Sequence, residues 1–185
     1  MERLPQNYIP ESLEQLLDIG IALSDTHNLG ELLNLILSKS REITCSDAGS
    51  VYLVDDVNLK EEKLIFKVAQ NDSLPELTFK EVALAMTSES LSGYVALTGK
   101  TLNLPNAYNL SRNTPYKFDK SFDERTGYRT CSVLLLPIQN QHKEIIGVLQ
   151  LINRKVESNV LLTKENAKEL TQPYSEWEER ILTSL

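Results

Sequence analysis

The chain has 185 residues, of which 41% are apolar and 24% charged, and its formal net charge is −7. This composition suits one globular domain with some length left for flanking helices, and the acidity makes nucleic acid a poor partner. The sequence contains neither an apolar run long enough to span a bilayer nor the apolar segment of a signal peptide, so we expect no membrane anchorage and a cytoplasmic location.

Two helices are predicted near the N-terminus. Apolar residues recur at helical spacing over residues 11–24. A second helix is expected to start at Asn28, whose side chain can cap the first turn, with Glu31 at the capping-box position. The apolar faces of these helices can join the core or pack against a second copy of the chain, and we expect a homodimer through the terminal helices.

Strand and helix patterns alternate in the middle of the chain. Residues 50–54 and 63–69 are rich in β-branched and aromatic side chains and predict an antiparallel hairpin. A short helix is expected over residues 88–98, capped by Ser88 and ended by Gly99.

A long connection separates a brief strand at residues 101–104 from a second hairpin. Residues 106–129 are polar, mixed in charge and partly aromatic, with no evident period. A connection of this length inside a small domain is usually a functional loop or lid. The strands of the second hairpin are predicted at residues 131–138 and 144–153.

The C-terminal part is predicted to leave the sheet and return as a helix. Residues 155–173 are expected to form an excursion with a short helical piece around residues 164–170. A last helix begins near Ser175, where Ser175 and Glu178 form a capping box. This order of elements predicts an α+β fold, with a central antiparallel sheet, helices packed on one face and the long loop over the other.

Few residues are suited to metal binding or catalysis. The sequence has two cysteines, Cys45 and Cys131, and two histidines, His27 and His142, with no metal-ligand spacing among them. We expect both cysteines to be small buried apolar residues. Since no Ser/His/Asp set, phosphate-binding loop or zinc motif is present, we predict no catalytic residue, no metal and no cofactor.

Several segments, taken in order, carry a resemblance to a known family. They are a helix leading into a glycine turn at residues 91–100, its continuation at 104–108, the entry to a strand at 122–130, and the hairpin segments 132–137 and 147–153. Their order and spacing resemble a GAF domain over residues 30–185, with residues 1–29 as a linker or dimerisation helix. The resemblance implies a GAF/PAS-like fold with a ligand pocket under the long loop, and a regulatory, small-molecule-sensing function without catalysis.

The resemblance is closest to GAF domains of cyclic-nucleotide phosphodiesterases and bacterial adenylyl cyclases. Those carry an Asn-Lys/Arg…Phe-x-x-x-Asp-Glu signature, and Asn153 and Arg154 fit its start. Its end departs from the pattern: Tyr174 stands for Phe and Glu178 for Asp, while Glu179 matches the last Glu. The resemblance implies a partly buried brace between Arg154 and Glu178 under the ligand site. The alternative is a surface ion pair worth less than about 1 kcal/mol.

The implied ligand is a cyclic nucleotide, cAMP or cGMP, with its phosphate at a helix N-terminus. The positions that match ligand contacts are Leu91 and Ser92 at the helix start, Ser50 and Gln70 at the base, Phe118 over the ligand, the hydroxyls of Thr126 and Thr130, and Gln150 on the last strand. Ala69 stands where an aromatic ring can stack on the base, and Gln70 where an Asp can read guanine. Because an amide both donates and accepts, Gln70 favours cAMP over cGMP.

Three alternatives to a nucleotide sensor can be compared with the sequence. A ligand-free dimerisation module is the main one. Some related folds reduce free methionine sulfoxide with a cysteine cluster, which Cys45 and Cys131 do not supply. Bilin attachment typically uses Cys followed by His, whereas Ser132 follows Cys131. Since the sequence ends at Leu185 without a helix-ending residue, we expect the last helix to lead into an effector domain of the same polypeptide, such as a cyclase, kinase, phosphodiesterase or HD-type phosphohydrolase.

Overall fold

A seven-stranded sheet organises the chain in the computed structural model, which describes residues 29–55 and 63–183. The strands are β1 (Ser46–Asp55), β2 (Lys63–Asn71), β3 (Val82–Ala85), β4 (Leu102–Leu104), β5 (Val133–Gln139), β6 (Ile145–Lys155) and β7 (Thr171–Gln172). The helices are α2 (Leu29–Thr44), α3 (Leu91–Thr98), α4 (Ser121–Thr126), α5 (Ala167–Leu170) and α6 (Glu176–Thr183). The helix expected over residues 11–24 lies outside the described residues.

The strands follow the order β3-β2-β1-β6-β5-β4, with β7 added beside the end of β6. All neighbouring strands run antiparallel, and β1 and β6, near the ends of the chain, meet at the centre of the sheet. Both predicted hairpins are present, as β1–β2 and β5–β6. The predicted α+β class with a central antiparallel sheet is therefore confirmed.

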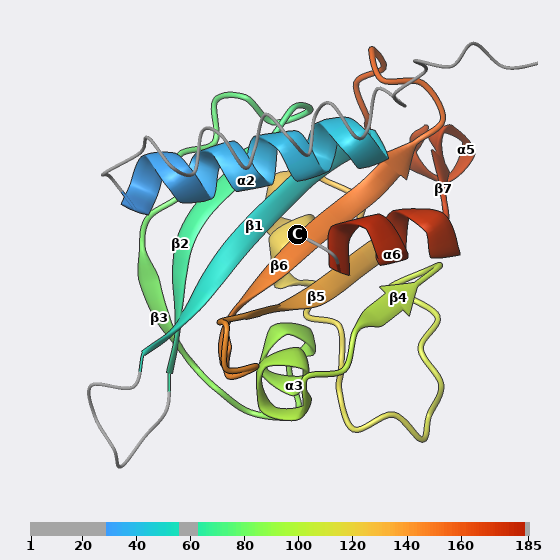
Figure 1. Ribbon diagram of the computed structural model, residues 1–185. Helices are drawn as coiled ribbons and strands as arrows, with labels where there is room; N and C mark the ends of the chain where they lie inside the picture. The colour runs from blue at the N-terminus through green and yellow to red at the C-terminus, as the bar shows by residue number, and fades with distance from the viewer. Residues whose placement is uncertain (1–28, 56–62, 184–185) are drawn as a thin grey trace, which may run out of the picture.

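The two faces of the sheet carry different covers (Figure 1). Helices α2 and α6 lie side by side over one face, where they enclose an apolar core. The members of this core are Leu33, Leu37, Val51, Leu134, Leu136, Leu149, Leu151, Tyr174 and Leu182. Helix α3 and the connection that follows β4 cover the other face and pack on a second core around Leu64, Val95 and Leu135. The short helix thus shares its face of the sheet with the long loop.

Helix α3 begins two residues later than its sequence suggested. The expected cap, Ser88, lies in the exposed turn before the helix, and Ser90 caps it by accepting a hydrogen bond of 3.1 Å from the Gly93 amide. Gly99 ends the helix as predicted, with a left-handed φ of 67° that glycine adopts without strain. A side chain at Gly93 would meet the carbonyl oxygen of Thr87 at 2.1 Å, so this turn and the helix pack closely.

Three short elements have no counterpart in the predictions. Strand β3 is a fully exposed edge strand of small and aliphatic residues, without the polar–apolar alternation of a half-buried strand. Helix α4 is a six-residue polar helix inside the long connection. Strand β7 comprises two residues. None of the helices within the described ranges is long and apolar enough to cross a membrane.

Candidate functional site

A cavity of about 430 Å³ lies between the sheet and the segments that cover its second face. Its floor comes from β1, β2 and β6, and its cover from α3, the connection after β4 and α4. Of the residues predicted to contact a ligand, those that line this cavity are Ser50, Gln70, Leu91, Ser92, Phe118, Thr130 and Gln150. The topology thus brings together seven positions spread over 100 residues of sequence.

The polar part of the floor lies where β1 and β6 pair. Ser50 is the direct partner of Gln150 in the register of these strands. The Tyr52 hydroxyl donates a 3.3 Å hydrogen bond to Oε1 of Gln150. Burial raises the pKa of Tyr52, which keeps this hydroxyl protonated as a donor at neutral pH. The floor therefore offers hydroxyl and amide groups to the polar edge of an occupant.

Gln70 borders the cavity, but its amide is bound to helix α2. Nη1 of Arg41 donates to its Oε1 at 3.0 Å, and its Nε2 donates to the carbonyl oxygen of Asn34 at 3.1 Å. Both partners belong to α2, which covers the opposite face of the sheet. The argument for cAMP over cGMP assumed a free amide at Gln70, so this geometry gives that preference no support.

Thr126 is the one predicted contact that does not line the cavity. Its hydroxyl donates to the carbonyl oxygen of Phe122 at 2.8 Å and accepts from the amide of Tyr128 at 3.2 Å. These bonds close the C-terminal end of α4. Thr130, four residues further on, is buried and does line the cavity.

One end of the cavity is suited to an anion. Leu91 and Ser92 form the first turn of α3, where backbone N–H groups have no intrahelical acceptor and the helix dipole is positive. Lys117 is bridged to Ser90 and donates its amide to the carbonyl oxygen of Glu89 at 2.8 Å, so the backbone of a basic residue lies beside this turn. Lys117 lines the cavity too. Sequence reasoning missed it because no pattern pairs the long loop with the start of α3.

Asp123 is a second lining residue that the sequence did not reveal. It is buried on α4 and accepts three hydrogen bonds: from the Tyr108 hydroxyl at 2.8 Å, the Thr130 amide at 2.7 Å and the Thr130 hydroxyl at 2.9 Å. Burial and the Asp123 carboxylate raise the pKa of Tyr108. Asp123 therefore fixes Thr130 and ties α4 to the long loop.

A buried polar network supports the wall of the cavity at Tyr128. The Tyr128 hydroxyl donates to Oδ2 of Asp47 at 2.7 Å and accepts from Nδ2 of Asn153 at 3.0 Å. Burial, with Asp47 next, raises the pKa of Tyr128 well above its usual value, so the hydroxyl stays a donor. Asn153 is fully buried with a left-handed φ of 59°, a conformation that asparagine tolerates.

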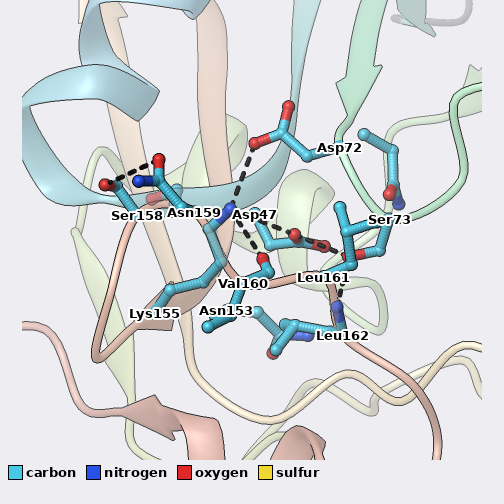
Figure 2. Close-up of polar contacts among 12 residues, drawn as sticks. Asp47, Asp72, Ser73, Asn153, Lys155, Ser158, Asn159, Val160, Leu161 and Leu162 are labelled. Carbon is cyan, nitrogen blue, oxygen red and sulfur yellow. Dashed lines mark hydrogen bonds and ion pairs between the residues drawn. The ribbon is translucent and has the colours of Figure 1, made fainter.

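The same network reaches the segment between β6 and α5 (Figure 2). The Lys155 ammonium lies 3.5 Å from Asp47 and 3.2 Å from Asp72, and it donates to the carbonyl oxygen of Val160 at 3.3 Å. Ser73 donates to Asp47 at 2.7 Å and accepts from the amide of Leu162 at 2.7 Å. The excursion expected at residues 155–173 is thus fastened beside the wall of the cavity.

The signature residues form contacts on the face of the sheet that α2 and α6 cover. Nε of Arg154 donates to Oε1 of Glu178 at 2.5 Å, and the side chains are 25% and 4% exposed, so the pair is partly buried. The Tyr174 hydroxyl shares a 2.8 Å hydrogen bond with Ser46, and burial raises its pKa. Glu179 accepts a 3.2 Å bond from Asn103. The α2–α6 face therefore carries the brace.

Among the described residues, neither cysteine belongs to a cluster of metal-ligating side chains. Cys131 is buried, whereas Cys45 is only partly buried and has a φ of 52°. Within the described ranges, no group of three or more His, Cys, Asp or Glu side chains could hold a metal ion.

The fold and cavity define an α+β domain with a site of small-molecule size between its sheet and its long loop. The sequence model of the GAF domain family matches residues 28–185, and the chain belongs to this family. Solved structures share the fold: the GAF domain of the Acinetobacter phosphoenolpyruvate-protein phosphotransferase has a TM-score of 0.66 at 20% identity, covering 96% of this chain and 89% of that one. The reduced form of fRMsr of Staphylococcus aureus has a TM-score of 0.62 at 12% identity, covering 98% and 94%.

Curated relatives with higher identity are phosphodiesterases. The chain is 38% identical over 128 residues to the dual 3',5'-cyclic-AMP and -GMP phosphodiesterase 11A of Takifugu rubripes, covering 68% of this chain and 13% of that protein. It is 31% identical over 144 residues to the probable 3',5'-cyclic phosphodiesterase pde-5 of Caenorhabditis elegans, covering 75% and 19%. The chain thus spans less than a fifth of the length of these two relatives.

Proposed function

We propose that this GAF domain binds a cyclic nucleotide, cAMP or cGMP, in the cavity between the sheet and the long loop. The observation that carries the proposal is the combination of groups around one cavity of about 430 Å³. The first turn of α3 and the basic residue Lys117 line one part of the cavity, the floor offers the polar groups of Ser50 and Gln150, and aromatic rings line the cavity as well. This volume lies in the range of small-molecule sites.

The relatives support the same ligand class. Both phosphodiesterases are named for their action on cyclic nucleotides, and the region matched here is a small part of each. A domain of this kind would report the nucleotide level to an effector in the same polypeptide. We propose that α2 and α6 transmit the signal to the effector, because Arg41 of α2 and Glu178 of α6 contact the strands that form the floor.

Calorimetric titration with cAMP and with cGMP tests the proposal. We expect at least one of them to bind more tightly than about 1 mM, which corresponds to roughly −4 kcal/mol. Thr130→Val should weaken this binding, whereas Thr126→Val is the matched control because Thr126 does not line the cavity. Lys117→Gln should weaken binding and reduce its salt dependence, while Lys120→Gln, outside the lining, should do neither. Binding of neither nucleotide below millimolar concentration would rule the proposal out.

The exposed apolar residues on the helical face favour a second role, dimerisation. Leu29 of α2 is 55% exposed and Trp177 of α6 is 50% exposed, and both helices lie over the same face of the sheet (Figure 1). We propose a parallel homodimer through this face. If no ligand binds, the domain would still serve as a dimerisation module.

A further inference from the structure

Five aromatic side chains line the cavity in an unbroken series. The ring centroids of neighbours along this series, Tyr52, Phe66, Phe79, Phe122 and Tyr128, are separated by 5.4, 5.9, 6.3 and 6.1 Å. Tyr52 and Phe66 belong to β1 and β2, Phe79 precedes β3, and Phe122 belongs to α4. The series therefore runs from the floor of the cavity into its cover.

The pair Phe79–Phe122 has a different geometry from the other pairs in the series. Its rings are nearly parallel, at 19°, whereas Tyr52–Phe66 and Phe122–Tyr128 meet edge to face at 68° and 74°. Carbon atoms in optimal contact lie about 3.5–4.0 Å apart, so two rings whose centroids are 6.3 Å apart do not form a close face-to-face pair. Both side chains are only partly buried and line the cavity, so they are accessible to a third planar ring.

We propose that Phe79 and Phe122 form the stacking surface of the cavity, which makes them the residues that select an occupant with a planar aromatic ring. Small side chains also line the cavity, namely Ala48 of β1, Ala69 of β2 and Ala85 of β3, and they leave room for a flat group. This inference rests on the proposed function, since the purine of a cyclic nucleotide is such a group, and it names the residues that hold it.

Both rings belong to segments that neighbouring contacts hold in place. Phe122 precedes Asp123, whose three hydrogen bonds anchor α4. Phe79 lies two residues before Glu81, which pairs with Lys67 of β2 at 2.6 Å, and shortly before β3, which pairs with β2. Rings fixed in this way lose little freedom on binding, so stacking contributes to affinity with little ordering cost.

The other reading is that the two rings are only an apolar cover. The two readings differ in their response to leucine, which keeps an apolar surface but removes the aromatic face. A matched pair of small probes separates them further: benzyl alcohol is planar and aromatic, whereas cyclohexylmethanol has the same carbon skeleton without the ring electrons. An apolar cover accepts both probes alike, but a stacking surface prefers benzyl alcohol.

The test is an NMR titration of the full chain with both probes, and with cAMP and cGMP. Wild type should bind benzyl alcohol more tightly than cyclohexylmethanol, and Phe79→Leu and Phe122→Leu should abolish that preference. Each variant should weaken nucleotide binding by about 5- to 150-fold. Phe79→Trp keeps an aromatic face at this position, so it should retain both the preference for benzyl alcohol and the nucleotide affinity that Phe79→Leu loses. Tyr116→Leu is the control, because Tyr116 pairs with Tyr94 at 4.8 Å and neither ring lines the cavity.

The outcomes separate this inference from the proposed function. If nucleotides bind wild type but neither leucine variant changes their affinity, the stacking surface is disproved and the nucleotide site stands. If the leucine variants weaken both probes equally, the rings are only a cover. If neither nucleotide binds but the preference for benzyl alcohol is present in wild type and lost in the variants, the stacking surface is established for a different planar ligand.

Discussion

At the scale of single residues, the burial of the Arg154–Glu178 pair distinguishes a partly buried brace from a surface ion pair. A surface ion pair would leave both side chains in water, yet Glu178 is only 4% exposed. The second carboxylate oxygen of Glu178 accepts from the amide of Ser175 at 2.7 Å and from its hydroxyl at 2.8 Å, so the predicted capping box is present. Glu178 therefore connects the start of α6 to β6 through Arg154.

Arg154→Ala should destabilise the domain by about 1–3 kcal/mol, because it leaves a buried carboxylate without its cation. Thermal unfolding measures this as a fall in Tm of about 2–4 °C for each kcal/mol in a domain of this size. Arg180→Ala is the control, since Arg180 is exposed on the same helix. Equal melting temperatures for Arg154→Ala and wild type would show that the pair contributes nothing.

How far the site could be predicted depends on whether its residues belong to a local pattern. Asn153, Arg154 and Glu178 stand in a recognisable motif and were found. Asp47 does not, because its buried partners, Tyr128 and Lys155, lie far along the chain; the pairing of β1 with β6 brings Lys155 close, and the end of the long connection brings Tyr128. Gln70 was identified, but the direction of its amide depends on Arg41 of α2, which the sequence does not indicate.

At the scale of elements, helix α3 forms one wall of the cavity and depends on its cap. Only eight residues long, α3 is too short to be stable by itself and gains from each satisfied terminal N–H group. Ser90 supplies the cap, and the helix ends at Gly99. The position of the cap sets which N–H groups face the cavity.

Ser90→Ala should therefore lower stability by about 1 kcal/mol and speed hydrogen exchange at the Gly93 amide, which loses its acceptor. Ser88→Ala should change neither quantity, because Ser88 lies before the helix. Thermal unfolding and amide exchange of both variants give the comparison. Faster exchange at the Leu91 amide in Ser88→Ala, with Gly93 unchanged in Ser90→Ala, would instead place the cap where the sequence suggested.

The elements that the sequence predicted are those with a strong period or a clear end. The two hairpins alternate or are densely β-branched, and α6 starts with a capping box. The sequence does not predict strand β3, because its pairing with β2, rather than a pattern in its own exposed side chains, makes it a strand. The error at Ser88 has a similar origin: serines at positions 88 and 90 both suit a cap, and the close approach of Gly93 to Thr87 favours the later one.

At the scale of the whole molecule, the sheet separates the cavity from helices α2 and α6. One face holds the cavity, and the other carries α2 and α6 (Figure 1). Arg41 links them, because it donates to the carbonyl oxygen of Asp47 at 2.8 Å and pairs with Asp72, which contacts Lys155. A ligand that displaces Tyr128 would act on Asp47 and, through it, on α2. A shift of α2 would alter the contact between two copies of the chain if the helical face is the dimer interface.

Trp177→Glu should disrupt the proposed dimer, because it places a charge in a contact that must lose its water. We expect light scattering at high micromolar concentration to show a dimer for the full wild-type chain and a monomer for the variant. Leu97→Glu is the matched control: Leu97 is 46% exposed, but on α3, over the opposite face of the sheet. A monomeric wild type would disprove the dimer. Loss of the dimer in Leu97→Glu, with Trp177→Glu unaffected, would move the interface to the face that holds the cavity.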